Sequence, residues 1–220
     1  MDAKFIPYSK DTYSEIETVA RSIEHFNYMN KRRTVRDFSS RPIPKQVIEN
    51  LIMTASTAPS GAHKQPWTFC VVTNSDLKSK IRIAAEKEEL ELYNNKISDE
   101  WREDLRYLGT DENKPFLQIA PALIILFKKS YDIDGDKKRT NYYVQESVGL
   151  ACGFLLEAIH YCGLVALTHT PSPMNFLIKL LNRPENEKPF LLIPIGYPSE
   201  NTMVPDLKRK DEKDIIVYYK

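Results

Sequence analysis

The chain has 220 residues, of which 42% are hydrophobic and 28% charged, a balance typical of a globular protein with a substantial core. Because 31 Lys and Arg residues oppose 30 Asp and Glu residues, no overall field favours nucleic acid or a membrane surface as a partner. The longest apolar stretch, residues 120–127, is too short to cross a bilayer, and the odd count of three cysteines favours reduced thiols and a cytoplasmic location.

The first half of the chain contains the spacings of three helices and one strand. Residues 11–30 carry apolar side chains at helical intervals, and Pro44 opens a second helix whose apolar face continues to Ala55. Residues 68–73 form a short β-rich run. A cap at Ser75-Asp76 then predicts a charged helix from about 76 to 96.

The second half predicts buried strands over residues 122–128, 164–168 and 190–196, with a long helix over 142–161. Strands that alternate with helices indicate an α/β arrangement, in which helices cover a central sheet. Since the chain has only seven glycines and neither a Gly/Ser linker nor an internal repeat, residues 1–220 are predicted to form a single domain.

The C-terminus ends in a β-prone apolar run, Ile215–Tyr219. Such a segment needs the edge of a sheet to pair with. The residues alone leave two alternatives equally open. The run closes the chain's own sheet, or it pairs with another subunit.

Two segments near the N-terminus suit a planar cofactor that bears a phosphate. Arg32, Arg33 and Arg36 can bind a phosphate through charge-assisted, partly bidentate hydrogen bonds. The small side chains of Thr-Ala-Pro-Ser-Gly-Ala, residues 57–62, let backbone N–H groups approach a ligand closely. Taken alone, the basic cluster favours a solvated connection between two helices, with a nucleic-acid patch as a lesser alternative.

These segments and several later ones resemble the iodotyrosine deiodinase family of the nitroreductase superfamily. Arg-Arg-Thr-Val-Arg and Ala-Pro-Ser-Gly-Ala-His-x-x-Pro-Trp look like its FMN-binding signature, and the matches extend over about residues 20–212. The later matches are Glu89, Tyr93, Lys114, and the segments 168–171, 196–198 and 204–210. The resemblance implies a nitroreductase-like α+β fold, with a mixed, mainly antiparallel sheet flanked by helices. It also implies an intertwined homodimer that exchanges C-terminal arms, residues 210–220.

The resemblance further implies FMN as the cofactor. A hydroxyl donated by Thr170 to flavin N5 would favour one-electron steps. His169 stands where some relatives have Thr, and it either faces away from the ring or contacts it, with a role as an acid as a minor alternative. The cofactor contacts that the resemblance implies are Arg32, Arg33, Thr34, Val35, Arg36, Pro59, Ser60, Gly61, Thr168, His169, Thr170 and Arg209.

The implied substrate is a halotyrosine. In the family the backbone N–H at Ala62 binds the phenolate, and because a halogen lowers the phenol pKa below about 10, halotyrosine is preferred over tyrosine. Glu89 would bind the ammonium, Lys114 the carboxylate, and Tyr93 the amino acid through its hydroxyl. These residues lie in a charged segment, residues 86–114, which is a predicted lid that orders on binding. Without the resemblance, the same segment reads as a solvated amphipathic helix.

The resemblance therefore implies FMN-dependent reductive dehalogenation of iodo-, bromo- and chlorotyrosine to tyrosine and halide. One alternative is a general NAD(P)H-dependent nitroreductase or quinone reductase, which has no need of Glu89 and Lys114. Another is a non-catalytic flavin- or halophenol-binding protein, which has no need of Thr170. No dinucleotide-binding fingerprint is present, so the sequence does not specify the electron donor. No spacing of Cys or His resembles a zinc site. Animal relatives carry an N-terminal membrane anchor that this sequence lacks, which agrees with a cytoplasmic location.

Overall fold

A computed structural model describes residues 3–8, 10–95 and 97–220 and divides the chain into two units, Met1–Arg32 and Arg33–Lys220. The first unit contains helix α1 (Glu15–Asn30). It begins at Ser14, whose side chain accepts from the backbone N–H of Glu17 while the Glu17 carboxylate accepts from that of Ser14, a reciprocal cap. The helix predicted over residues 11–30 therefore forms over its last 16 residues.

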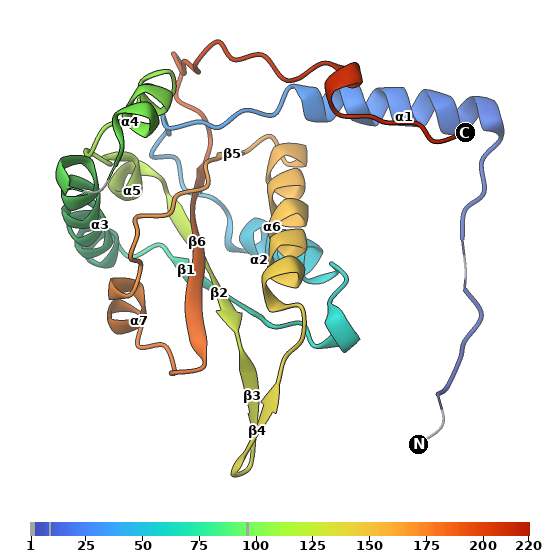
Figure 1. The fold of residues 1–220 in the computed structure, drawn as a ribbon, viewed down its shortest axis with the longest axis horizontal. Helices are drawn as coiled ribbons and strands as arrows, with labels where there is room; N and C mark the ends of the chain where they lie inside the picture. Colours follow the sequence, from blue (N-terminus) through green and yellow to red (C-terminus); the bar gives the residue numbers. More distant parts are fainter. Residues whose placement is uncertain (1–2, 9, 96) are drawn as a thin grey trace. The chain divides into compact units, whose positions relative to one another are not determined.

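The second unit is built on a four-stranded sheet in the order β1-β2-β6-β5 (Figure 1). Its strands are β1 (Trp67–Val72), β2 (Ala122–Lys129), β5 (Val165–Ala166) and β6 (Glu187–Gly196), and each neighbouring pair is antiparallel. The three strands predicted from apolar runs are confirmed, although the one predicted over 164–168 has only two ladder residues. A parallel bridge from Thr34 to Ala166 extends the edge at β5.

Helices cover both faces of this sheet, because β2 is apolar on both sides. Ile124 and Leu126 pack in the core with α2 (Lys45–Ser56) and α6 (Val144–Tyr161). The alternate residues Leu123, Ile125 and Phe127 pack in a second core with α3 (Ser75–Asn95), α5 (Phe116–Ile119) and α7 (Phe176–Leu180). This alternation explains why β2 reads as a continuous apolar run.

The remaining elements are short and polar. A hairpin of β3 (Tyr131–Asp134) and β4 (Lys137–Thr140) turns at Gly135, which has a φ of 60°. Helix α4 (Asp99–Arg106) follows α3, and two 3-10 turns are η1 (Gly61–His63) and η2 (Glu212–Asp214). In the described part of the chain, no helix is both long enough and apolar enough to span a membrane.

The C-terminal run does not close the chain's own sheet. Residues 215–220 form no strand, and the side chains of Ile215 to Tyr219 are between 42% and 94% exposed. The alternative of a strand that pairs within the chain is therefore wrong. The apolar residues 215–219 have no strand partner among the described residues of their own chain.

Candidate active site

The first part of the site is an extended segment along the sheet edge. The backbone N–H of Val35 donates to the carbonyl of Ala166 at 3.2 Å, and that of Ser39 donates to Tyr197 at 2.9 Å. Arg33 donates to the carbonyl of Pro205, three residues before the second basic cluster, residues 208–210. Arg32 ends the other unit. The sheet edge therefore holds Arg33, Thr34, Val35 and Arg36 in one line.

Arg36 is the part of this segment most clearly prepared for an anion. Its Nη1 lies 3.4 Å from the carbonyl of Leu108, and its buried Nε has no hydrogen-bond partner among the described residues. Burial lowers the pKa of Arg36, because the charged form loses hydration. A buried donor without a partner is costly, and an anionic ligand would supply the missing acceptor.

The segment that follows β5 lies next to these arginines. His169 exchanges two backbone hydrogen bonds with Leu192 of β6, at 2.9 and 3.0 Å, so its backbone continues the ladder. Because side chains alternate along an extended segment, Thr168 and Thr170 are exposed while His169 is buried. Their hydroxyls are open to a ligand.

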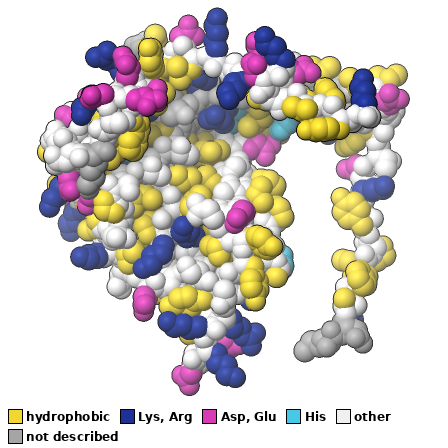
Figure 2. Space-filling model, in the orientation of Figure 1, with side chains coloured by type: hydrophobic (Ala, Val, Ile, Leu, Met, Phe, Trp, Pro, Cys, Tyr) yellow, Lys and Arg dark blue, Asp and Glu magenta, His cyan; other side chains and the backbone are white. Residues whose placement is uncertain are grey.

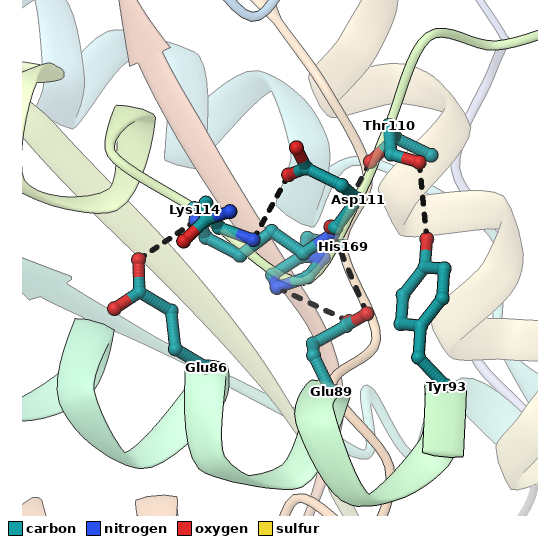
Figure 3. A network of polar contacts seen from close by, with 8 residues as sticks. Glu86, Glu89, Tyr93, Thr110, Asp111, Lys114 and His169 are labelled. Atoms are coloured by element: carbon teal, nitrogen blue, oxygen red, sulfur yellow. Dashed lines mark hydrogen bonds and ion pairs between the residues drawn. The ribbon is translucent and has the colours of Figure 1, made fainter.

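The predicted substrate residues meet in one polar network (Figure 3). Glu89 and Tyr93 lie one turn apart on α3, and the Lys114 Nζ lies 3.4 Å from the Glu89 Oε2. Lys114 also donates to the Thr110 hydroxyl at 3.1 Å and to the Asp111 carbonyl. The Tyr93 hydroxyl donates to the Thr110 carbonyl at 3.2 Å. The two charges are nearly buried, so each serves as the counterion of the other.

The electrostatics of this network are set by burial. Burial raises the pKa of Glu89, and the nearby Lys114 ammonium opposes that change. The Nε2 of His169 lies 3.8 Å from the Glu89 Oε1. Burial, together with the charges of Lys114 and Arg36, lowers the pKa of His169 to about 3, so its ring is neutral at physiological pH. Of the roles considered for His169, the geometry agrees with a side chain that faces away from the surface of Thr168 and Thr170.

The small-residue loop lies at the start of α6. The backbone N–H of Gly61 donates to the Ser147 hydroxyl at 3.2 Å, and a Cβ at Gly61 would lie 2.8 Å from the carbonyl oxygen of Tyr142. Ala62, which is exposed, has a φ of 49° and His63 one of 54°. Left-handed conformations of non-glycine residues cost on the order of 1–3 kcal/mol each and concentrate at ligand sites.

One chain does not bring all the predicted site residues together. The loop of Pro59, Ser60, Gly61 and Ala62 packs on the first turn of α6, whereas Ala166 and the segments beside it follow the last turn (Figure 1). An 18-residue helix is about 27 Å long. The site is therefore divided within the chain into two parts. The loop part is residues 59–62, and the arginine–lid part consists of residues 33–36 and 168–170 together with Glu89, Tyr93 and Lys114.

The arginine–lid part fits a phosphorylated planar cofactor. It offers the guanidiniums of Arg33 and Arg36, the exposed hydroxyls of Thr34, Thr168 and Thr170, and an unpartnered buried donor at Arg36. No group of three or more His, Cys, Asp or Glu side chains in the described residues could hold a metal ion.

Sequence reasoning missed the residues that hold Lys114 and Tyr93 in place. Thr110 accepts from Lys114 and Tyr93, and Glu86 accepts from the backbone N–H of Lys114 at 2.8 Å. Residues 108–114 have no apolar periodicity, and hydrogen bonds of this kind leave no pattern in a sequence. Only their proximity to Lys114 could have drawn attention to them.

Comparison with known proteins decides the family. Residues 29–197 match the nitroreductase family. The chain belongs to this family. Among its nitroreductase relatives, the iodotyrosine deiodinase of Haliscomenobacter hydrossis is 63% identical over 216 residues, which is 98% of this chain and 97% of the relative. Human iodotyrosine deiodinase 1 is 45% identical over 98% of this chain and 75% of its own length.

Solved nitroreductase-family structures agree with the fold. An oxidized iodotyrosine deiodinase bound to FMN and 3-iodo-L-tyrosine superposes with a TM-score of 0.76, at 32% identity, over 89% of this chain and 98% of that one. A nitroreductase with bound FMN from Bacteroides fragilis gives 0.65 at 20% identity over 89% and 99%, which shows the fold alone. The predicted family, its nitroreductase-like fold and its FMN cofactor are confirmed.

Proposed function

We propose that this nitroreductase-family protein is an FMN-dependent reductive dehalogenase that converts 3-iodotyrosine, and also bromo- and chlorotyrosine, to tyrosine and halide. The observation that carries the proposal is the buried pair of Glu89 and Lys114 beside Tyr93 and next to the arginine segment. A reductase for uncharged nitroaromatics or quinones has no use for an anion and a cation held together in this position.

The pair of Glu89 and Lys114 favours an amino acid as ligand, because each side chain can replace its present partner with the opposite charge of a zwitterion. Lys114 lies against Glu89 at 3.4 Å and neutralises it. A zwitterion offers an ammonium to Glu89 and a carboxylate to Lys114, so both buried charges keep a partner when the pair opens. A ligand with one charge that draws one ion out of the pair leaves the other buried ion unpaired, which costs several kcal/mol, and a neutral ligand offers neither ion a partner. The arrangement therefore favours free amino acids over simple halophenols.

The other residues act on the two ends of the ring system. The backbone N–H of Ala62 binds the phenolate oxygen, which selects the more acidic halophenol over tyrosine. Arg33 and Arg36 hold the phosphate of the cofactor, with Arg209 completing the basic set, and Thr170 donates from its hydroxyl to the ring. Bound FMN supplies the two electrons that, with one proton, exchange the carbon–halogen bond for a carbon–hydrogen bond and release halide.

A homodimer follows from the division of the site. The Ala62 N–H and the Thr170 hydroxyl serve the same stacked rings, yet one chain places them at opposite ends of a helix about 27 Å long. We infer that the loop of one copy completes the site of a second copy. The surface over α6 agrees with such an interface (Figure 2). There Leu150 and Phe154 are 47% and 36% exposed, beside the open glycines 149 and 153.

The exposed C-terminal run, Ile215–Tyr219, supplies a second interface. In the described residues β1 pairs only with β2, so its outer edge is available for an added strand. A cavity of about 900 Å³ opens beside the end of β1. Its lining combines apolar side chains, among them Ile43, Ile52 and Val71, with polar and charged ones such as Lys45 and Glu49. We propose that each arm, residues 210–220, pairs there with the other copy. Removal of residues 210–220 should then weaken the dimer in sedimentation and weaken FMN binding, whereas dimers of unchanged stability would exclude arm exchange.

The reaction is tested with purified holoenzyme under anaerobic conditions. Dithionite replaces the unidentified physiological donor, and 3-iodotyrosine is added to the reduced protein. We expect reoxidation of the flavin with one tyrosine and one iodide per flavin, and loss of this reaction in Glu89→Gln and Lys114→Met. A protein that ignores 3-iodotyrosine but reduces nitroaromatics with NAD(P)H is a general nitroreductase. Binding of the halotyrosine without turnover would make it a binding protein.

A further inference from the structure

His169 has a buried hydrogen-bonding atom that the proposed reaction leaves unused. Its Nε2 is one of four buried side-chain polar atoms in the described residues without a hydrogen-bond partner. The side chain is 8% exposed, and its ring packs edge-on against Phe116, with 5.6 Å between the ring centres and 87° between the planes. Because unpartnered buried donors are costly, this atom calls for an explanation.

The ring is held in place by its backbone and its neighbours. Both backbone hydrogen bonds to Leu192 fix the main chain at this residue, and Phe116 fixes the ring from the side of α5. The nearest carboxylate is that of Glu89, whose Oε1 lies 3.8 Å from Nε2 (Figure 3). That distance is too long for a hydrogen bond, and a shift of about 1 Å by Glu89 would make one.

Substrate binding supplies a reason for such a shift. In the structure, Lys114 approaches the other oxygen, Oε2, of Glu89 at 3.4 Å. If Lys114 turns to a substrate carboxylate, Glu89 loses that contact and must be held by another donor while it binds the ammonium. The Nε2 of His169 lies by Oε1 of Glu89, whereas Lys114 lies by Oε2, so the two side chains contact different oxygens of the same carboxylate (Figure 3). Catalytic-site hydrogen bonds commonly tighten only in the complex.

We propose that His169 is a positioning residue for amine recognition, a neutral donor whose Nε2–H binds the Oε1 of Glu89 when a halotyrosine occupies the site. The hydrogen bond keeps Glu89 ionised and leaves Oε2 directed at the substrate ammonium. Neutrality suits the role, since a charged imidazolium would compete with that ammonium for the same carboxylate. This inference rests on the proposed binding of the zwitterion by Glu89 and Lys114.

The test compares two ligands that differ only at the amine. The dissociation constants of 3-iodotyrosine and N-acetyl-3-iodotyrosine are measured by quenching of flavin fluorescence in the full-length FMN-bound protein. In His169→Leu, which keeps an apolar side chain but removes the donor, we expect binding of 3-iodotyrosine to weaken about tenfold or more. The N-acetyl ligand should bind more weakly than 3-iodotyrosine to the wild type because it has no ammonium. Its dissociation constant and that of FMN should be the same in His169→Leu as in the wild type. His169→Gln, which retains a neutral donor, should restore most of the loss.

Other results would overturn the inference. Equal weakening of both ligands, or equal damage by Leu and Gln, would make His169 a packing residue. Unchanged binding of 3-iodotyrosine in His169→Leu would exclude any role in recognition. A wild-type protein that binds FMN but not 3-iodotyrosine would instead refute the proposed function.

Discussion

Replacing Lys114 with Met should destabilise the substrate-free protein in a pH-dependent way. At 3.4 Å and an effective dielectric constant of about 20, the Lys114–Glu89 attraction is about 5 kcal/mol, which offsets the cost of burying both ions. Without the ammonium, Glu89 stays as an uncompensated buried charge or takes up a proton. Since its ordinary pKa is 4.5, protonation at pH 7 costs about 3.4 kcal/mol at 1.36 kcal/mol per unit, and this limits the loss.

The sign of the pH effect follows from the direction of the pKa. In Lys114→Met the folded-state pKa of Glu89 lies above its unfolded value, so between the two the folded protein binds the extra proton. Stability therefore falls as pH rises above about 4.5, by about 1.4 kcal/mol per unit. We expect a loss of about 3 kcal/mol at pH 7 and less than about 1 kcal/mol at pH 5.

Urea unfolding of the FMN-bound protein at pH 5 and pH 7, at one protein concentration, measures this loss. Lys87→Met, which removes an exposed lysine from α3, the helix of Glu89, is the matched control and should change little. The double variant Glu89→Gln/Lys114→Met should regain most of the stability and lose the pH dependence. An equal loss at both pH values, or a double variant as unstable as the single one, would refute the assignment of the cost to Glu89.

Three further predictions concern the cofactor side of the site. Gly61→Ala should cost about 1–3 kcal/mol in urea unfolding, because its Cβ would lie 2.8 Å from the Tyr142 carbonyl; a neutral result would show that the loop can move. Arg36→Met should weaken FMN binding at least about tenfold by fluorescence titration, since a charged hydrogen bond is lost, and an unchanged constant would place the phosphate elsewhere. Thr170→Ala should bind FMN and 3-iodotyrosine normally but slow anaerobic reoxidation by halotyrosine; an unaltered rate would exclude a hydrogen bond to the ring.

The larger elements could be predicted from the sequence because burial leaves a periodic pattern. The long α6 and the continuous apolar β2 were placed within two residues of their observed ends. The β3–β4 hairpin was missed, since its strands are charged and only Gly135 marks the turn. The length of strand β5 was overestimated, because the apolar residue Leu167 is buried although it lies beyond the end of the two-residue ladder.

The sequence could predict which residues belong to the candidate site, but not how they are arranged in space. Glu89, Tyr93 and Lys114 were expected together, and the structure brings them together. The 3.4 Å contact between Lys114 and Glu89 could not be read from spacing, since it depends on the loop that Thr110 and Glu86 hold. The separation of Ala62 from Thr170 was also hidden, because a sequence motif does not show whether its parts meet in one chain or in two.

The central claim is that two copies of the chain build one halotyrosine site, and a mixed dimer tests it most directly. Arg36→Ala disables the arginine–lid part in one tagged chain, and Gly61→Val disables the loop part in the other. Each homodimer should bind little FMN, whereas the mixed dimer keeps one intact site composed of the unaltered part of each chain. We predict about half of the wild-type FMN content and half of the anaerobic iodide release. A mixed dimer that binds no FMN and releases no iodide would contradict the claim, because it would mean that each site is contained in a single chain.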